Sequence, residues 1–256
     1  MSFIREQARR RWAEEWKEAA HVVGAGTLLA PEALTIGFAR RFATYKRSSL
    51  LFRDFERLRK ILVNPWRPVQ IVFSGKAHPA DDPGKQMLQE IFDFSRDPRL
   101  EGRVAFLEDY DLHLAHRLVQ GVDLWLNLPR PPLEACWTSG MKAALNAVPQ
   151  LSTLDGWWLE GYDGLNGWAI SPTEEDEDAD AADAEQMYRL LEEEVVPAYF
   201  DRDADGVPTR WTQKMKHALH TAGARFTSRR MVQQYVRQSY VPALRGEMPG
   251  DDAPSV

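Results

Sequence analysis

Short apolar runs alternate with helical patterns along the first part of the chain. Apolar, β-rich runs predict buried strands at 33–39, 69–75, 103–109 and 122–128. Apolar residues recur every three or four positions, as in a helix, at 48–62, 83–94, 112–119 and again after 140. This order predicts an α/β fold with a doubly wound, Rossmann-like parallel sheet. Ligands of such sheets bind beyond the carboxyl ends of the strands.

The last third of the chain has a different pattern. Helical periodicity runs through 184–200, 209–222 and 228–244, and we expect these helices to pack over the edge of the sheet. The whole chain then divides into an N-terminal helix and linker at 1–31, a Rossmann-like core at 32–172, an acidic loop at 173–186, C-terminal helices at 187–243 and a disordered tail at 244–256.

Charge and cysteine content narrow the function classes. The chain has 256 residues and a net charge of −6, and eight acidic side chains without any lysine or arginine fall within 173–185. We interpret that stretch as a surface loop or the solvated start of a helix. A mildly acidic protein without a long basic tract is a poor candidate for nucleic-acid binding.

The sequence also bears on where in the cell the protein is located. The single cysteine, Cys136, excludes an internal disulfide and favours the cytoplasm. The charged N-terminus has no apolar core of an export signal, and no run of ~18 apolar residues could span a membrane.

A basic cluster directly follows the first predicted strand. Arg40, Arg41 and Lys46 lie there with Tyr45 among them. Three cations at the mouth of a parallel sheet favour an anion that neutralises them, and arginine and lysine are the usual partners of phosphate. A solvated basic turn explains the same residues equally well.

A second candidate anion site lies in the segment EACWTSGMKAALNA, which starts at 134. Thr138, Ser139 and Gly140 precede a predicted helix, whose first N–H groups can bind phosphate. Lys142 lies one turn further on. A lysine in an apolar, anion-rich pocket can lose its proton and form a Schiff base with an aldehyde cofactor, although a lysine on a helix surface is the commoner case.

Metal binding is not indicated. Residues 201–212 have the aspartate and glycine spacing of a calcium loop, but Thr212 stands where a bidentate glutamate is needed and Pro208 interrupts the loop. We interpret the segment as an acidic turn. The six histidines show no spacing typical of metal ligands.

Six motifs in order resemble one family, the α-glucan phosphorylases, which act on glycogen, starch and maltodextrin with pyridoxal 5′-phosphate. They cover about 32 to 243 and are most similar to the C-terminal half of the short bacterial type. The motifs are GFARRFATYKR, SGKAHPADDPGK, FLEDYD, EACWTSGMKAALN, LDGWWLEGYDGLNGWAI and YFDRDADGVPTRW. The resemblance implies the C-terminal domain of a two-domain, glycosyltransferase-B-type fold.

The resemblance also implies roles for individual residues. Lys142 would form the Schiff base, and Lys142, Arg41 and Lys46 would be catalytic. The cofactor would be held by Arg40, Lys46, Tyr110, Thr138, Ser139 and Gly140. The substrates would be bound by Arg41 at phosphate and by Tyr45, Glu134, Cys136 and Trp137 around the sugar.

The reaction implied is the phosphorolysis of α-1,4-glucan by inorganic phosphate, which releases glucose 1-phosphate. In this family the cofactor's phosphate exchanges a proton with inorganic phosphate. Cations would offset the repulsion between the two phosphates in a site that excludes water. The glucan-binding half of the family lies N-terminal to the matched region, so we expect this chain alone to be inactive unless a partner chain supplies that half.

Two positions depart from the family pattern. Trp137 and Ala147 stand where the family has glycine. We expect the Trp137 indole either to occupy the sugar's place or to point into an open cleft, so that Trp137→Gly would strengthen glucose 1-phosphate binding. Two alternatives stay open: a truncated, non-catalytic domain that binds pyridoxal phosphate or sugar, and a nucleotide-sugar glycosyltransferase domain, which would leave Lys142 unexplained.

Overall fold

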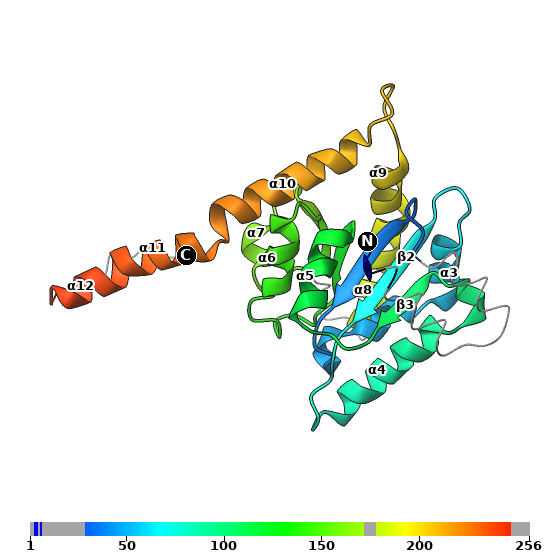
Figure 1. Ribbon diagram of the computed structural model, residues 1–256, viewed down its shortest axis with the longest axis horizontal. Helices are drawn as coiled ribbons and strands as arrows, with labels where there is room; N and C mark the ends of the chain where they lie inside the picture. The colour runs from blue at the N-terminus through cyan, green and yellow to red at the C-terminus, as the bar shows by residue number, and fades with distance from the viewer. Residues whose placement is uncertain (1–2, 5, 7–28, 172–177, 247–256) are drawn as a thin grey trace.

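A parallel β-sheet forms the centre of the molecule. The computed structural model describes residues 3–4, 6, 29–171 and 178–246. Within these residues the sheet has six strands, all parallel, in the order β3-β2-β1-β4-β5-β6 (Figure 1). The strands are β1 (Leu34–Ala39), β2 (Val69–Ser74), β3 (Val104–Leu107), β4 (Leu124–Asn127), β5 (Gln150–Thr153) and β6 (Gly167–Ile170). The predicted α/β class and doubly wound parallel sheet are confirmed.

The strand order reverses at the centre of the sheet. Ile36 of β1 pairs with Ile71 of β2 on one side and with Leu124 of β4 on the other. Every residue of β1 and β2 is buried, because helices cover both faces of the sheet. The chain therefore winds outward in opposite directions from β1 and β4, and a crevice opens at the carboxyl ends of these two strands.

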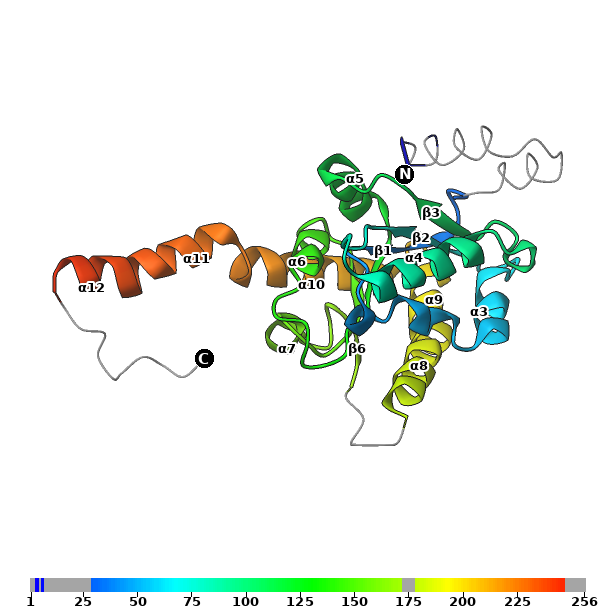
Figure 2. The same cartoon turned by 90° about the horizontal axis from the view of Figure 1, so that it is seen from below.

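Helices cover both faces of the sheet (Figure 2). The buried apolar residues form two separate clusters, one on each face. On one face lie α3 (Phe55–Leu62), α4 (Asp82–Ser95), α8 (Ala179–Leu190) and α9 (Val196–Phe200). On the other lie α5 (Leu112–Gly121), α6 (Thr138–Leu145), α7 (Trp158–Gly161) and most of α10 (Thr209–Arg225). Helix α10 contacts both α6 and α9, so it crosses the edge of the sheet.

Aspartates start several of these helices. The side chains of Asp81, Asp111 and Asp178 each accept a hydrogen bond from the backbone N–H three residues further on. This bond satisfies one of the N–H groups that a first helical turn leaves without a partner. These caps explain why α4, α5 and α8 begin where they do.

The described part of the acidic stretch is the start of a helix, which is one of its two interpretations from sequence. Residues 172–177 lie outside the described residues, but α8 already begins at Ala179, so the second part of the predicted loop 173–186 is helical. Asp183 is buried rather than solvated, and its carboxylate contacts Arg47. The sequence indicated solvated carboxylates because the partner of Asp183 is remote in the chain and cannot be recognised from the neighbouring residues.

The C-terminal helices behave in two ways. As predicted, α8, α9 and α10 pack against the body of the protein. The last segment does not, and the expectation that it covers the sheet edge is wrong: α11 (Ser228–Tyr235), the π-helical turn η5 (Val236–Tyr240) and α12 (Val241–Leu244) project away from the sheet with no buried residue (Figures 1 and 2).

Most of the predicted N-terminal helix and C-terminal tail lies outside the residues that the structure describes. At the two ends of the chain, the residues outside are 1–2, 5, 7–28 and 247–256. In the ranges that are described, no helix combines the length and apolar character that crossing a membrane requires.

Candidate functional site

The candidate site lies where the strand order reverses. The turn that follows β1 carries Arg40 and Lys46, and the loop that follows β4 carries Glu134. The two segments are adjacent, because β1 pairs with β4 and the backbone N–H of Arg130 donates to the carbonyl of Tyr45 at 2.7 Å. The topology thus brings the two candidate anion sites of the sequence to one crevice.

Three buried charged side chains form the core of the site. One Glu134 carboxylate oxygen accepts a hydrogen bond from Arg40 Nη2 and lies 3.4 Å from Lys46 Nζ. Arg40, Lys46 and Glu134 are only 7–8% exposed. Two cations share one carboxylate, so the cluster keeps one uncompensated positive charge, which favours an anion.

Arg40 has further unused hydrogen-bonding capacity. Its Nε and Nη1 atoms are buried and have no hydrogen-bond partner among the described residues. Buried donors without a partner are uncommon in folded proteins, and a bound oxyanion is one way to satisfy them. The free donors and the excess positive charge indicate the same kind of ligand.

The electrostatics of the cluster lower the pKa of its cations. Burial, and next the neighbouring Arg40, lower the pKa of Lys46 from 10.5 to about 8, against the opposing effect of Glu134. Burial also lowers the pKa of Arg40, again opposed by Glu134. Both shifts reflect the cost of holding positive charge away from water, which a bound anion would relieve.

We therefore expect inorganic phosphate to bind more weakly as pH rises above about 8, the pKa of Lys46 in the free protein. An anion binds the ammonium form, so once Lys46 is mostly neutral the affinity should fall by up to about tenfold per pH unit. Phosphate keeps its own charge over this range, so the change reports on the protein. Calorimetric titration at a series of pH values measures the effect.

Lys46→Met serves as the control for this pH dependence. It should bind phosphate less tightly and lose the decline above pH 8, because the titrating group is gone. A decline that persists in Lys46→Met would assign the pH dependence to another group.

A cavity of about 330 Å³ lies between the start of α5 and α6. Lys142 and Ser139 border it from α6, and Tyr110 borders it from the loop before α5. Lys142 is exposed at this cavity rather than held in the core. The remaining lining is mainly apolar and includes Leu112, Ala115, Val119, Trp125 and Leu145, with His116 and Asn146.

Tyr110 links the cavity to the charged cluster. Its hydroxyl donates to the carbonyl of Ala39 at 3.4 Å, directly beside Arg40 in the chain. Burial raises the pKa of Tyr110, and the nearby charge of Arg40 partly opposes this. An elongated ligand could therefore reach from Lys142 toward Arg40 past the tyrosine ring.

The remaining predicted site residues lie around this crevice. Arg41 and Cys136 are exposed, whereas Tyr45 is half-buried with Lys46 Nζ 5.1 Å from its ring centre. The positive charge of Arg41 contributes to the lowered pKa of Lys46, so the two side chains are neighbours. At the start of α6, Thr138 is exposed and its first-turn neighbour Gly140 is buried.

Trp137 is placed differently from the sequence expectation. It precedes α6 in the left-handed conformation (φ 61°, ψ 57°) that glycine favours, and its side chain is 3% exposed. The indole packs against Trp157 and Trp158, with ring centres 6.1 and 6.2 Å away, and lies over Gly140, where a Cβ would be 2.7 Å from it. It fills the core beneath α6, so neither predicted position, in the sugar's place or in an open cleft, is correct.

Sequence reasoning missed one residue that supports the site. Asp155, buried after β5, accepts the backbone N–H of Glu134 at 2.8 Å. The next residue, Gly156, has φ 54°, and a Cβ there would lie 3.0 Å from the Glu134 carbonyl. This Asp-Gly turn therefore positions the loop that carries Glu134. If the strand before this Asp-Gly pair had been recognised in the sequence, it would have indicated that Asp155 lies at the same edge of the sheet as the site.

The acidic turn at 201–212 organises its own backbone. The Asp203 carboxylate accepts the N–H groups of Asp205 and Val207 at 3.0 and 2.9 Å. Among the residues described, no three histidine, cysteine or acidic side chains are gathered as metal ligands would be.

The fold is that of an α/β protein with a doubly wound parallel sheet. At the point where the strand order reverses, the sheet carries a buried pair of cations whose excess positive charge favours an anion. The family model for carbohydrate phosphorylases matches residues 4–164 of the chain. The chain belongs to this family, and the resemblance noted in its motifs is confirmed.

Individual relatives agree with this assignment. The chain is 52% identical over 244 residues to glycogen phosphorylase of Aquifex aeolicus, covering 95% of this chain and 35% of that protein. It is 50% identical over 215 residues to maltodextrin phosphorylase of Thermococcus litoralis, covering 83% of this chain and 25% of that protein. The chain thus spans about a third or less of the length of these relatives.

A solved structure shares the fold. HepE of Anabaena, in complex with UDP, aligns with a TM-score of 0.57 over 82% of this chain and 49% of that chain, at 19% identity. At this identity the likeness concerns the fold alone.

Proposed function

We propose that this chain is the cofactor- and phosphate-binding part of a pyridoxal-phosphate-dependent α-glucan phosphorylase. The observation that carries the proposal is the buried cluster of Arg40, Lys46 and Glu134 next to the cavity that Lys142 borders. A phosphate-bearing aldehyde suits this arrangement, because one end would meet cations and the other an amine. Membership of the family supports the proposal.

The residues present fit pyridoxal phosphate. Lys142 supplies the amine that would bind the aldehyde, and the apolar walls of the cavity and the Tyr110 ring suit an aromatic ring. Lys46 and the free donors of Arg40 would meet the phosphate group, together with N–H groups at Thr138 and Ser139. The fit rests on the unpartnered Arg40 nitrogens and on the donor chemistry of the cavity.

The cofactor would supply a phosphate group that exchanges a proton with inorganic phosphate. The protein's part is to hold two anions side by side. Lys46 and Arg40 offset their repulsion from a water-poor position, and Arg41 at the exposed edge of the crevice would bind the substrate phosphate. Glu134 orients Arg40 and, with Tyr45, would bind hydroxyls of the glucosyl unit.

Phosphorolysis of α-1,4-glucan to glucose 1-phosphate is proposed for the larger protein that the relatives represent, because this chain spans only 35% of the length of the Aquifex enzyme. We propose that the remaining part of such an enzyme, in the same or another chain, provides the opposite wall of the crevice and the glucan contacts.

The test is covalent labelling. Incubation with pyridoxal phosphate followed by borohydride should place one adduct on Lys142, because this amine borders the cavity that would hold the aldehyde. We expect Lys142→Ala to lose at least about nine-tenths of the adduct, as located by peptide mass mapping.

Lys85→Ala is the matched control, since Lys85 is also an exposed helical lysine but lies on α4. Labelling should be unchanged in that variant. Adducts spread over surface lysines, with Lys142→Ala labelled like the wild type, would show that the cavity is not a pyridoxal phosphate site.

A further inference from the structure

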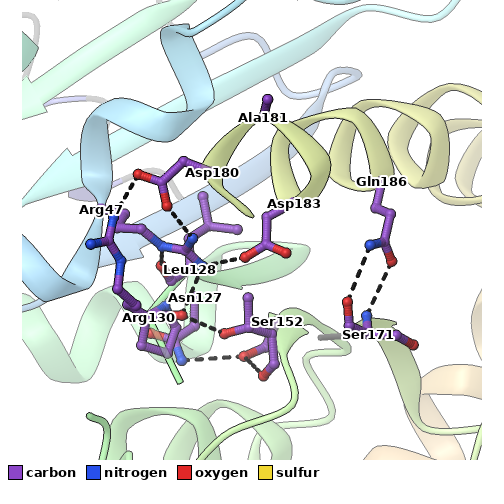
Figure 3. Close-up of polar contacts among 12 residues, drawn as sticks. Arg47, Asn127, Leu128, Arg130, Ser152, Ser171, Asp180, Ala181, Asp183 and Gln186 are labelled. Carbon is purple, nitrogen blue, oxygen red and sulfur yellow. Dashed lines mark hydrogen bonds and ion pairs between the residues drawn. The ribbon is translucent and has the colours of Figure 1, made fainter. Parts of the chain in front are cut away.

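Arg47, directly after Lys46, is a buried cation whose three guanidinium nitrogens all have hydrogen-bond partners (Figure 3). Its guanidinium donates to the carbonyls of Leu128 and Pro129, both at 2.9 Å. It also forms ion pairs with Asp180 at 2.7 Å and with Asp183 at 2.6 Å. The side chain is only 4% exposed, and its backbone adopts a left-handed conformation (φ 44°).

These contacts join three segments that are far apart in sequence. One is the turn that carries Lys46, the second is the exit of β4 that leads to Glu134, and the third is the beginning of α8. A second arginine reinforces the junction, because Arg130 also pairs with Asp180 at 2.7 Å (Figure 3). Helix α8 thus influences the position of both loops of the site, although no residue of α8 belongs to the site.

The contacts of Arg47 contribute more to the geometry of the two loops than to the stability of the protein. Buried ion pairs often contribute little net free energy, because desolvation offsets their attraction. A guanidinium is instead a rigid, planar fork whose donors fix the direction of every partner. Arg47 uses that fork on two backbone carbonyls of one loop while its own backbone belongs to the other.

We propose that Arg47 is a positioning residue, anchored by Asp183 of α8, that holds the turn carrying Arg40 and Lys46 against the Glu134 loop at the separation at which Glu134 contacts both cations and orients them toward one phosphate group. This inference rests on the proposed function. Arg47 acts through its neighbours, since its own donors are occupied by the protein.

Arg47→Lys tests the proposal with inorganic phosphate as the probe. Lysine keeps the charge but cannot hold both carbonyls and both carboxylates, so the loops should separate and phosphate should bind on the order of tenfold more weakly. Asp183→Asn, a milder change that keeps the shape, should weaken phosphate binding in the same direction. Calorimetry on variants shown to be folded by circular dichroism gives both affinities.

A second readout separates positioning from general damage. Pyridoxal without its phosphate should label Lys142 equally in wild type and Arg47→Lys, because α6 is not among the segments that Arg47 joins. Labelling by pyridoxal phosphate should fall. Unchanged phosphate affinity in folded Arg47→Lys, or equal loss of labelling by both aldehydes, would overturn the positioning role.

Glu192→Gln is the matched control, since it weakens the Arg57–Glu192 ion pair, which lies outside the site. Phosphate affinity should not change in this variant. The proposed function fails separately: a wild-type protein that binds phosphate but forms no Lys142 adduct would refute pyridoxal phosphate binding and leave the role of Arg47 measurable.

Discussion

Replacing Glu134 with glutamine should lower the free energy of unfolding by about 3–5 kcal/mol, the cost of removing one partner from a buried ion pair. Glutamine keeps the shape of the side chain but not its charge. Arg40 and Lys46 would then be buried together without compensation, each less than a tenth exposed. The pKa of Lys46, already lowered by burial, would lose the opposing effect of Glu134 and fall further.

Urea unfolding followed by tryptophan fluorescence, with and without excess inorganic phosphate, measures this effect. Phosphate should stabilise Glu134→Gln more than the wild type, because the anion supplies the missing negative charge. Glu160→Gln on α7 is the control: this glutamate is exposed, and its loss should change stability by less than about 0.5 kcal/mol. Stability of Glu134→Gln within about 1 kcal/mol of the wild type would mean that the cations are better hydrated than their burial indicates.

Truncating Trp137 should also be costly, and glycine should be tolerated better than alanine. Trp137→Ala is expected to lose about 3–5 kcal/mol, because the indole packs on Trp157 and Trp158 in the core. Trp137→Gly should lose about 1 kcal/mol less, since a left-handed backbone strains any residue with a Cβ. Trp137 is the N-cap of α6, where glycine is also preferred over alanine, so both effects favour Trp137→Gly.

Ala147→Gly is the control for the backbone effect alone. Ala147 lies two residues after the end of α6 at φ 60°, where the N–H of Val148 donates to the carbonyl of Ala143 and glycine is normally preferred. This variant should gain about 1 kcal/mol. Because the indole lies in the core, Trp137→Gly should bind glucose 1-phosphate as the wild type does. A tenfold gain in affinity would mean instead that the indole fills the sugar pocket.

The sequence predicted the sheet to the extent that its strands are apolar. Strands β1 to β4 are mainly apolar, which identifies buried parallel strands without any tertiary information. Strand β5 is short and contains Gln150, Ser152 and Thr153, all buried, so its composition is typical of a loop. Its neighbours in the sheet decide its conformation.

The candidate site was predictable in composition but not in geometry. The residue types of the basic turn and of the helix start indicate phosphate by their chemistry alone. The pairing of Arg40 with Glu134, the support from Asp155 and the direction of the Trp137 indole all depend on partners remote in sequence. No local pattern encodes such contacts.

The ion pairs of Arg47 with α8 also bear on the order in which the chain folds. The paired residues are 133 and 136 positions apart, whereas β1 and β2 are joined by a single crossover. During synthesis from the N-terminus, the first strands and their helices leave the ribosome well before Asp183. Arg47 stays hydrated until then, and the two loops remain free to move. The contacts that complete the crevice are therefore among the last to form, and their long sequence separation gives them a large loop-closure entropy.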